Sequence, residues 1–197
     1  QDQRLPYDPA APVTTQVQQS FESSLEHLQT TYLDSLVLHG PSVTHGLAPQ
    51  DVEAWRAMEV LCDSGRVRRI GISNVSTDQL EQLCNQARIA PAFVQNRCYA
   101  STGWDAHTRA VCRARGIAYQ GFSLLTANRQ ELQRPIVDQI MGRSGLTRSQ
   151  VVFRFAIEVG MIPLTGTSSA PHMREDLAVQ GRQLSAADVR AIETIAS

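Results

Sequence analysis

Short apolar runs alternate with longer amphipathic segments along almost the whole chain, and this alternation constrains the fold more than any other feature. Five runs have the length and composition of strands: 32–38, 67–72, 93–96, 117–121 and 161–164. The segments with helical spacing are 17–28, 51–64, 76–87, 105–115, 135–143, 148–159, 169–178 and 185–196. Such an alternation predicts an α/β protein with a parallel sheet.

Local signals support the predicted helix ends. Ser76 with Gln79, and Thr147 with Gln150, have the spacing of a capping box, in which each side chain satisfies a free backbone N–H at the start of a helix. Gly116 follows one predicted helix, where a glycine readily adopts the left-handed conformation of a C-terminal cap.

The domain organisation predicted from these segments is simple. Residues 1–14 contain three prolines and predict an exposed N-terminal arm or loop, and residues 15–197 predict one domain. Two architectures fit the alternation, an open doubly wound sheet and part of a closed barrel. Periodicity alone leaves both open.

Composition excludes several classes of partner and chemistry. A net charge of −1 argues against nucleic acid and anionic membranes as partners, and no apolar run is long enough to span a bilayer. The four cysteines are widely spaced and predict reduced thiols rather than a metal site, so we expect a soluble, cytoplasmic protein. All 18 basic residues are arginines, so no step can use a lysine.

Each predicted strand ends in polar or ring-bearing side chains. In both architectures the chemistry lies at the carboxyl ends of the strands. These ends read His39-Gly40-Pro41, Ser73-Asn74, Gln95-Asn96-Arg97, Phe122-Ser123 and Thr165-Gly166-Thr167. A sheet that served stability alone would not need them.

Together these strand ends resemble those of the aldo-keto reductases, over nearly the whole chain. The segments that carry the resemblance are LHG at 38–40, GRVRRIGISN at 65–74, PAFVQNRCY at 91–99, YQGFSLL at 119–125 and IPLTGTSSAPHMREDL at 162–177. The resemblance implies an incomplete (β/α)8 TIM barrel of about five βα units with C-terminal helices. It also implies reduction of a small-molecule carbonyl to an alcohol with NAD(P)H, without metal or flavin.

The family's catalytic set consists of a histidine, a tyrosine, a lysine and an aspartate. His39 matches the histidine that orients the carbonyl, and a hydrogen-bonded core histidine is the alternative interpretation. The other three lie upstream of Gln1 in the family pattern. We therefore expect a truncated reductase that is weak or inactive as given.

The resemblance also assigns cofactor-binding residues to the strand ends. These are Ser73, Asn74 and Gln95 for the nicotinamide carboxamide, Phe122 for stacking on the nicotinamide ring, and Ser123 and Leu125 for the pyrophosphate. For the adenosine end they are Thr165, Thr167, Ser168, Ser169, His172, Glu175 and Asp176. The alternatives are turn chemistry for Ser73 and Asn74, a core aromatic for Phe122, and solvated helix surface for Glu175 and Asp176.

Two further assignments concern specificity. Many family members have a lysine and an arginine near the positions of Leu164 and His172, where they bind the 2′-phosphate. NADP(H) is expected over NAD(H) by family habit, although this chain lacks both cations. Trp104 is a weak candidate for lining the substrate pocket, with a core anchor or an exposed loop residue as alternatives.

Other functions remain open from the sequence. A non-catalytic module that binds a nicotinamide nucleotide or another protein fits the same residues, and exposed barrel edges would favour self-association. A flavodoxin-like protein is disfavoured, because no glycine-rich phosphate loop follows any predicted strand.

Overall fold

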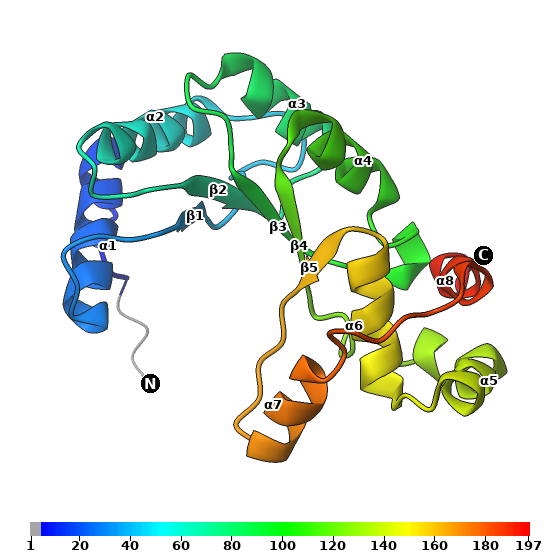
Figure 1. Cartoon of the computed structure of the whole chain (residues 1–197). Helices are drawn as coiled ribbons and strands as arrows, with labels where there is room; N and C mark the ends of the chain where they lie inside the picture. Colours follow the sequence, from blue (N-terminus) through cyan, green and yellow to red (C-terminus); the bar gives the residue numbers. More distant parts are fainter. Residues whose placement is uncertain (1–4) are drawn as a thin grey trace. The chain divides into compact units, whose positions relative to one another are not determined.

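The computed structural model describes residues 5–197. The chain divides into two compact units, the first ending at Val94 and the second spanning Gln95–Ser197 (Figure 1). Each unit is built from parallel strands with helices packed against them.

Within residues 5–94 the first unit contains three helices and two complete strands, together with the beginning of a third strand. In chain order these are α1 (Val13–Leu28), β1 (Leu36–Leu38), α2 (Pro49–Asp63), β2 (Ile70–Ser73), α3 (Thr77–Gln86) and the start of β3 (Phe93–Arg97). Strands β1 and β2 are parallel, with Leu36 opposite Ile70. Gly71 is required in β2, because a Cβ there would lie 2.3 Å from a ring carbon of Phe93.

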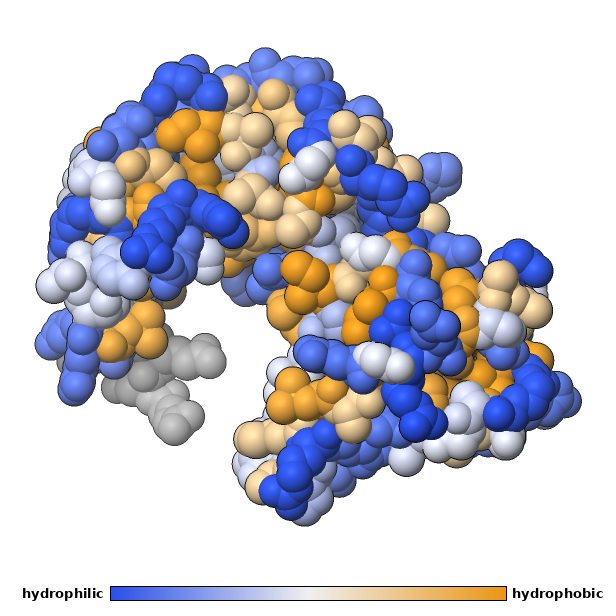
Figure 2. Space-filling view, viewed as in Figure 1, coloured by the Kyte–Doolittle hydropathy of each residue, from blue (hydrophilic) through white to orange (hydrophobic). Residues whose placement is uncertain are grey.

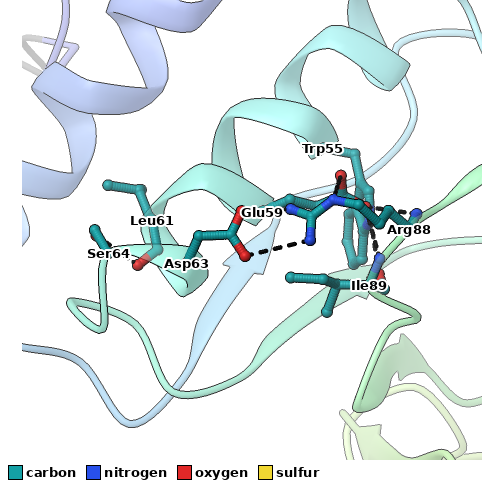
Figure 3. Close-up of polar contacts among 7 residues, drawn as sticks. All are labelled: Trp55, Glu59, Leu61, Asp63, Ser64, Arg88 and Ile89. Carbon is teal, nitrogen blue, oxygen red and sulfur yellow. Dashed lines mark hydrogen bonds and ion pairs between the residues drawn. The ribbon is translucent and has the colours of Figure 1, made fainter.

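The buried carboxylate of Glu59 connects α2 to the segment between α3 and β3 through hydrogen bonds. Glu59 is 5% exposed, and its Oε1 accepts hydrogen bonds from the backbone N–H groups of Arg88 and Ile89 at 2.8 and 2.9 Å (Figure 3). Trp55 adds a bond from its indole N–H to the Ile89 carbonyl at 3.1 Å. These contacts satisfy backbone groups at a place where the chain leaves a helix.

The second unit contains five helices and two complete strands. In chain order after β3 they are α4 (Ala106–Arg115), β4 (Ala118–Phe122), α5 (Pro135–Ser144), α6 (Arg148–Glu158), β5 (Met161–Pro163), α7 (Ala170–Leu177) and α8 (Ala186–Glu193), with short 3-10 turns at Ala100–Thr102 and Glu131–Gln133. Strands β4 and β5 are parallel, with Tyr119 opposite Met161. The core of the unit includes Trp104 packed on Phe155, with ring centroids 5.1 Å apart.

The strand order distinguishes the two predicted architectures. Strands are hydrogen-bonded in chain order, β1-β2-β3-β4-β5. A doubly wound sheet reverses its strand order at a switch point, whereas a barrel adds each strand next to the previous one. The prediction of an incomplete (β/α)8 barrel is therefore confirmed.

The first strand differs from its prediction. The run 32–38 was expected to be a mostly buried strand, but regular pairing covers only Leu36–Leu38, preceded by an isolated bridge from Leu33 to Val67. Leu36, Val37 and Leu38 are half-buried. Within residues 5–197 no strand flanks the outer side of β1, so part of its apolar surface stays accessible.

The expected N-terminal arm falls partly outside the described residues, since residues 1–4 are not among them. Residues 5–12 precede α1 without helical structure, and most of their side chains are exposed. The backbone N–H of Asp8 donates to Gln19 of α1 at 2.8 Å. Helix α1 begins at Val13, two residues before the predicted domain boundary.

The surface is mixed in character. In the space-filling view hydrophilic residues predominate along the rim of the first unit, and hydrophobic residues are interspersed among them (Figure 2). None of the helices in residues 5–197 combines the length and the apolar character needed to cross a membrane.

Candidate functional site

His39 follows β1 directly and is exposed. Within the described residues His39 is therefore not part of the buried core, and its catalytic role stays a prediction. Its backbone carbonyl accepts a hydrogen bond from the side-chain amide of Asn74, at 2.8 Å. The end of β1 is therefore fixed to the end of β2, while the imidazole is left accessible.

Asn74 occupies the left-handed region, with φ of 51°, immediately after β2. Asparagine tolerates this conformation better than most residues because its short amide makes local hydrogen bonds. Gly40 lies close to the end of β2, and a Cβ at this position would lie 3.2 Å from the carbonyl oxygen of Ser73. The close approach of the two strand ends thus depends on a small residue after His39.

Ser73 and Asn74 were predicted to bind the nicotinamide carboxamide together with Gln95. Ser73 is 5% exposed and has an interaction within the described residues, whereas Asn74 is exposed. In this structure the Asn74 amide bonds to His39, which matches the turn chemistry considered as the alternative. A joint role of the three residues in binding stays a prediction.

In the second unit Gln95 projects from β3 toward the neighbouring strand. Its amide donates to the side-chain oxygen of Gln120 in β4 at 3.0 Å, and both side chains are half-buried. Gln120 was not identified from the sequence. The amide pair therefore links β3 to β4 through side chains as well as through the backbone.

A cavity of about 360 Å³ lies at the carboxyl ends of β4 and β5 in the same unit. It is lined by Phe122, Ser123, Leu124, Leu125, Thr126, Phe153, Leu164, Thr165 and Gly166. The position is the one where barrels place their ligands, and apolar walls with a few hydroxyls are typical of such sites. Ser123 has a positive φ of 57°, an uncommon conformation for a residue other than glycine.

The cavity brings together four of the predicted cofactor residues, namely Phe122, Ser123, Leu125 and Thr165. Phe122 is half-buried and lines the cavity. This position differs from the alternative interpretation of Phe122 as a core aromatic residue. Phe153 was missed because on α6 it belongs to the apolar stripe of an ordinary packed helix. No signal in the sequence separates it from its buried neighbours.

The remaining predicted residues of the adenosine end lie outside the lining of this cavity. Thr167 accepts the backbone N–H of Ser169 at 3.1 Å, and Ser169 is the N-cap of α7. Ser168 and His172 are exposed. These residues shape the start of α7, and their predicted contact with a cofactor stays a prediction.

Glu175 and Asp176 are not simple solvated helix surface. Asp176 accepts the Thr165 hydroxyl at 2.8 Å, which ties α7 to a residue that lines the cavity. Glu175 accepts hydrogen bonds from the hydroxyls of Thr147 and Ser149 at the N-terminus of α6. A carboxylate is favourable there because it faces the positive end of the helix dipole.

Trp104 lies in the core of the second unit, which was one of the alternatives to its weak assignment to the substrate pocket. It is 0% exposed, and its indole N–H donates to the Ile192 carbonyl at 2.8 Å. Its ring packs against Phe155 of α6 in a tilted arrangement. As described, Trp104 offers no surface to a substrate, because α6 and α8 already cover it.

The residue after Trp104 organises a polar cluster that the sequence did not reveal. Asp105 accepts hydrogen bonds from Tyr119 Oη at 2.7 Å, Asn96 Nδ2 at 2.9 Å and Thr108 Oγ1 at 2.8 Å. Burial raises the pKa of Tyr119 far above its ordinary value, so the phenol remains a donor to the carboxylate. The cluster fixes the start of α4 to β3 and β4.

The Cys98 thiol lies buried in the second unit. Burial raises the pKa of the Cys98 thiol to about 12, which keeps it in the unreactive protonated form. In residues 5–197 no group of three or more histidine, cysteine, aspartate or glutamate side chains could hold a metal ion.

Comparison with known proteins agrees with this arrangement. A family model described as the aldo/keto reductase family matches residues 12–197. Aldo-keto reductase family 4 member C11 of Arabidopsis thaliana is 30% identical over 84% of this chain and 57% of its own length. The NAD/NADP-dependent indole-3-acetaldehyde reductase of Schizosaccharomyces pombe is 27% identical over 91% of this chain and 64% of its own length.

Solved structures show the same relationship. The aldo/keto reductase of Brucella melitensis is 26% identical, with a TM-score of 0.82 over 91% of this chain and 66% of its own. A second structure, of a variant protein in complex with NADPH, is also 26% identical with a TM-score of 0.82, over 91% of this chain and 65% of its own. The chain spans about three fifths of the length of the curated relatives it matches. On this evidence the chain belongs to the aldo/keto reductase family.

Proposed function

We propose that this chain is part of an oxidoreductase that reduces a small carbonyl compound to an alcohol with NAD(P)H. The observation that carries the proposal is the cavity at the carboxyl ends of β4 and β5, which lies within the family match. When bound, the cofactor supplies the hydride that reaches the carbonyl carbon.

The residues of the cavity fit a nicotinamide nucleotide. Phe122 offers an aromatic face for the nicotinamide ring, and the hydroxyl of Ser123 offers a hydrogen bond to a phosphate oxygen. Leu125 and Leu164 supply the apolar wall. In the first unit the exposed imidazole of His39 donates to the carbonyl oxygen and orients it.

The proton donor of the family mechanism is proposed to come from a preceding segment. The family set also needs a lysine, and residues 1–197 contain none. Residues 1–197 alone would then bind the cofactor but reduce carbonyls slowly, since general acid catalysis is worth roughly 10²–10⁴-fold.

We propose NADP(H) rather than NAD(H) as the cofactor, because the family usually uses NADP(H). The structure in complex with NADPH and the NAD/NADP-dependent relative support a nicotinamide cofactor of either kind. Leu164 lines the cavity without a charge. Replacement of Leu164 by lysine should therefore increase the affinity for NADPH relative to NADH, by on the order of tenfold, because it adds a cation near the phosphates.

Cofactor binding is the first test of the proposal. Isothermal titration calorimetry with NADPH and NADH should detect binding to the purified chain, and Phe122→Ala should weaken it by about tenfold through loss of stacking. Tyr32→Ala, which removes a partly exposed aromatic in the first unit, is the matched control. If neither NADPH nor NADH binds to the wild-type chain, the cofactor assignment is refuted.

Catalysis is tested on the protein as its source makes it. Oxidation of NADPH is followed by absorbance with glyoxal as the carbonyl probe, the substrate named for a relative in Bacillus subtilis. His39→Ala should lower kcat/KM by about 10²-fold or more if the imidazole orients the carbonyl. Equal kcat/KM values for the wild-type protein and for His39→Ala would show that His39 does not belong to the catalytic set.

Association of two copies is a second candidate function, supported by the state of the edge strands. Ile162 in β5 is 49% exposed, and the side chains of β1 are half-buried. Unpaired strand edges of this kind favour pairing with another chain. Sedimentation of the wild-type chain should then show a dimer that Ile162→Lys dissociates.

A further inference from the structure

The middle of the loop that follows His39 is held by a buried side chain from another element. Gln79 lies in α3, is 3% exposed, and reaches across to residues that are 33–36 positions earlier in the chain. Its amide nitrogen donates to the carbonyl oxygens of Val43 and Gly46 at 2.9 Å each, and to that of Thr44 at 3.4 Å.

The same amide also caps α3 through its oxygen. Gln79 Oε1 accepts the backbone N–H of Ser76 at 3.0 Å, while the Ser76 hydroxyl accepts the N–H of Gln79. This arrangement determines the orientation of the amide, because the opposite one would place its oxygen against three carbonyl oxygens. A capping box needs only the oxygen, which glutamate also provides. The amide nitrogen is therefore available for the loop.

The ends of the loop are fixed separately. Asp51, the third residue of α2, is 6% exposed and accepts the backbone N–H groups of Ser42 at 2.9 Å and Ala48 at 2.8 Å. Gln79 holds the middle of the loop and Asp51 holds both ends, so residues 41–48 have a defined conformation although several of their side chains are exposed. Polar side chains that satisfy several loop backbone groups at once restrict the loop strongly.

We propose that Gln79 is a positioning residue, which holds the loop 41–48 in the conformation in which it borders the substrate pocket of the proposed reductase. The loop continues directly from His39 at the carboxyl end of β1, where the loops of a barrel form the active site. It presents Val43, which is 40% exposed, and His45, and it carries no carboxylate and no arginine. Such a loop fits an uncharged carbonyl compound. The assignment to the substrate pocket rests on the proposed function, whereas the positioning of the loop does not.

Two variants separate the clamp from the helix cap. Gln79→Glu keeps the oxygen that accepts from Ser76 and replaces the nitrogen that holds the loop. Ser76→Ala removes the cap hydroxyl and leaves the Gln79 side chain intact. Gln86→Glu makes the same chemical change on the same helix at an exposed position, and serves as the control.

Limited proteolysis with thermolysin tests the positioning of the loop. Thermolysin cleaves before apolar residues, and Val43 and Leu47 provide such sites within the loop. We expect cleavage there at least tenfold faster in Gln79→Glu than in the wild type, with Ser76→Ala and Gln86→Glu close to the wild type. Unchanged cleavage in Gln79→Glu, or equal acceleration in Ser76→Ala, would overturn the positioning role.

Kinetics on the protein as its source makes it test the assignment of the loop to the substrate pocket. With glyoxal as the probe, Gln79→Glu should raise KM about tenfold while kcat changes less than threefold, because the loop contributes to binding rather than to proton transfer. An unchanged KM despite faster loop cleavage would overturn the assignment to the substrate pocket. A wild-type protein without reductase activity would refute the proposed function, and the proteolysis would still decide the role of Gln79.

Discussion

Removal of the Glu59 carboxylate should destabilise the first unit far more than removal of the neighbouring surface ion pair. Glu59 is buried and accepts two backbone N–H groups, from Arg88 and Ile89 (Figure 3). Leaving a donor of this kind without a partner costs about 1–3 kcal/mol each. For Glu59→Ala we expect the free energy of unfolding to fall by about 2–4 kcal/mol, since both groups are partly buried.

Two further variants divide this value into its causes. Glu59→Gln keeps an acceptor oxygen and loses the charge, so we expect a cost of about 1–2 kcal/mol, the difference between charged and neutral hydrogen bonds. Asp63→Asn breaks the ion pair from Asp63 to Arg88, whose side chains are 54% and 57% exposed. Exposed pairs are worth about 0–1 kcal/mol, so this variant should be close to the wild type.

Urea unfolding followed by tryptophan fluorescence measures the difference. Trp55 is 1% exposed and bonds to the Ile89 carbonyl, so its emission reports on the region around Glu59. The slope of free energy against urea should stay constant if the variants change stability alone. A loss below about 1 kcal/mol for Glu59→Ala, or an equal loss for Asp63→Asn, would refute the explanation from buried hydrogen bonds.

The remaining predictions concern buried groups in both units. Burial raises the pKa of Cys98 from 9.0 to about 12, so the unfolded thiol ionises first, and stability falls as pH rises above 9. At pH 10 this loss is about 1.4 kcal/mol, and Cys98→Ala should remove this part of the pH dependence, as measured by urea midpoints between pH 8 and pH 10. Tyr119→Phe should cost about 2 kcal/mol by losing its 2.7 Å hydrogen bond to a carboxylate, and a thermal midpoint unchanged within about 2 °C would contradict this. Gly71→Ala should lower the free energy of unfolding by about 3 kcal/mol or more, because the new Cβ would overlap the Phe93 ring. Gly142→Ala, with open space around it in α5, should raise the free energy of unfolding by about 0.5–1 kcal/mol in the same thermal unfolding assay.

Much of the fold could be predicted from local patterns. The capping boxes at Ser76 and Thr147 mark the starts of α3 and α6, and both have the predicted hydrogen bonds. These signals act over a few residues, so the sequence alone contains them. The strand β1 was predicted too long and too buried, because its exposure depends on whether another strand covers it.

The candidate site was predicted in part. Phe122 and Thr165 were assigned through the family resemblance, and the structure brings them together around one cavity. Trp104 was assigned to a substrate pocket only weakly, and its burial under Ile192, 88 residues later in the chain, has no local signal. Phe153 joins the cavity through packing of α6, which periodicity cannot separate from ordinary core.

The sequence by itself determined the order of strands and helices, the helix caps and the family, because each follows from residues close together or from motifs at strand ends. The tertiary structure decided which polar side chains serve the fold and which remain free for a ligand. Gln79 has the same cap spacing as Gln150, yet only its contacts show that it clamps the loop after His39. The physical reason is that burial and hydrogen bonding are properties of the assembled unit, formed by groups tens of residues apart.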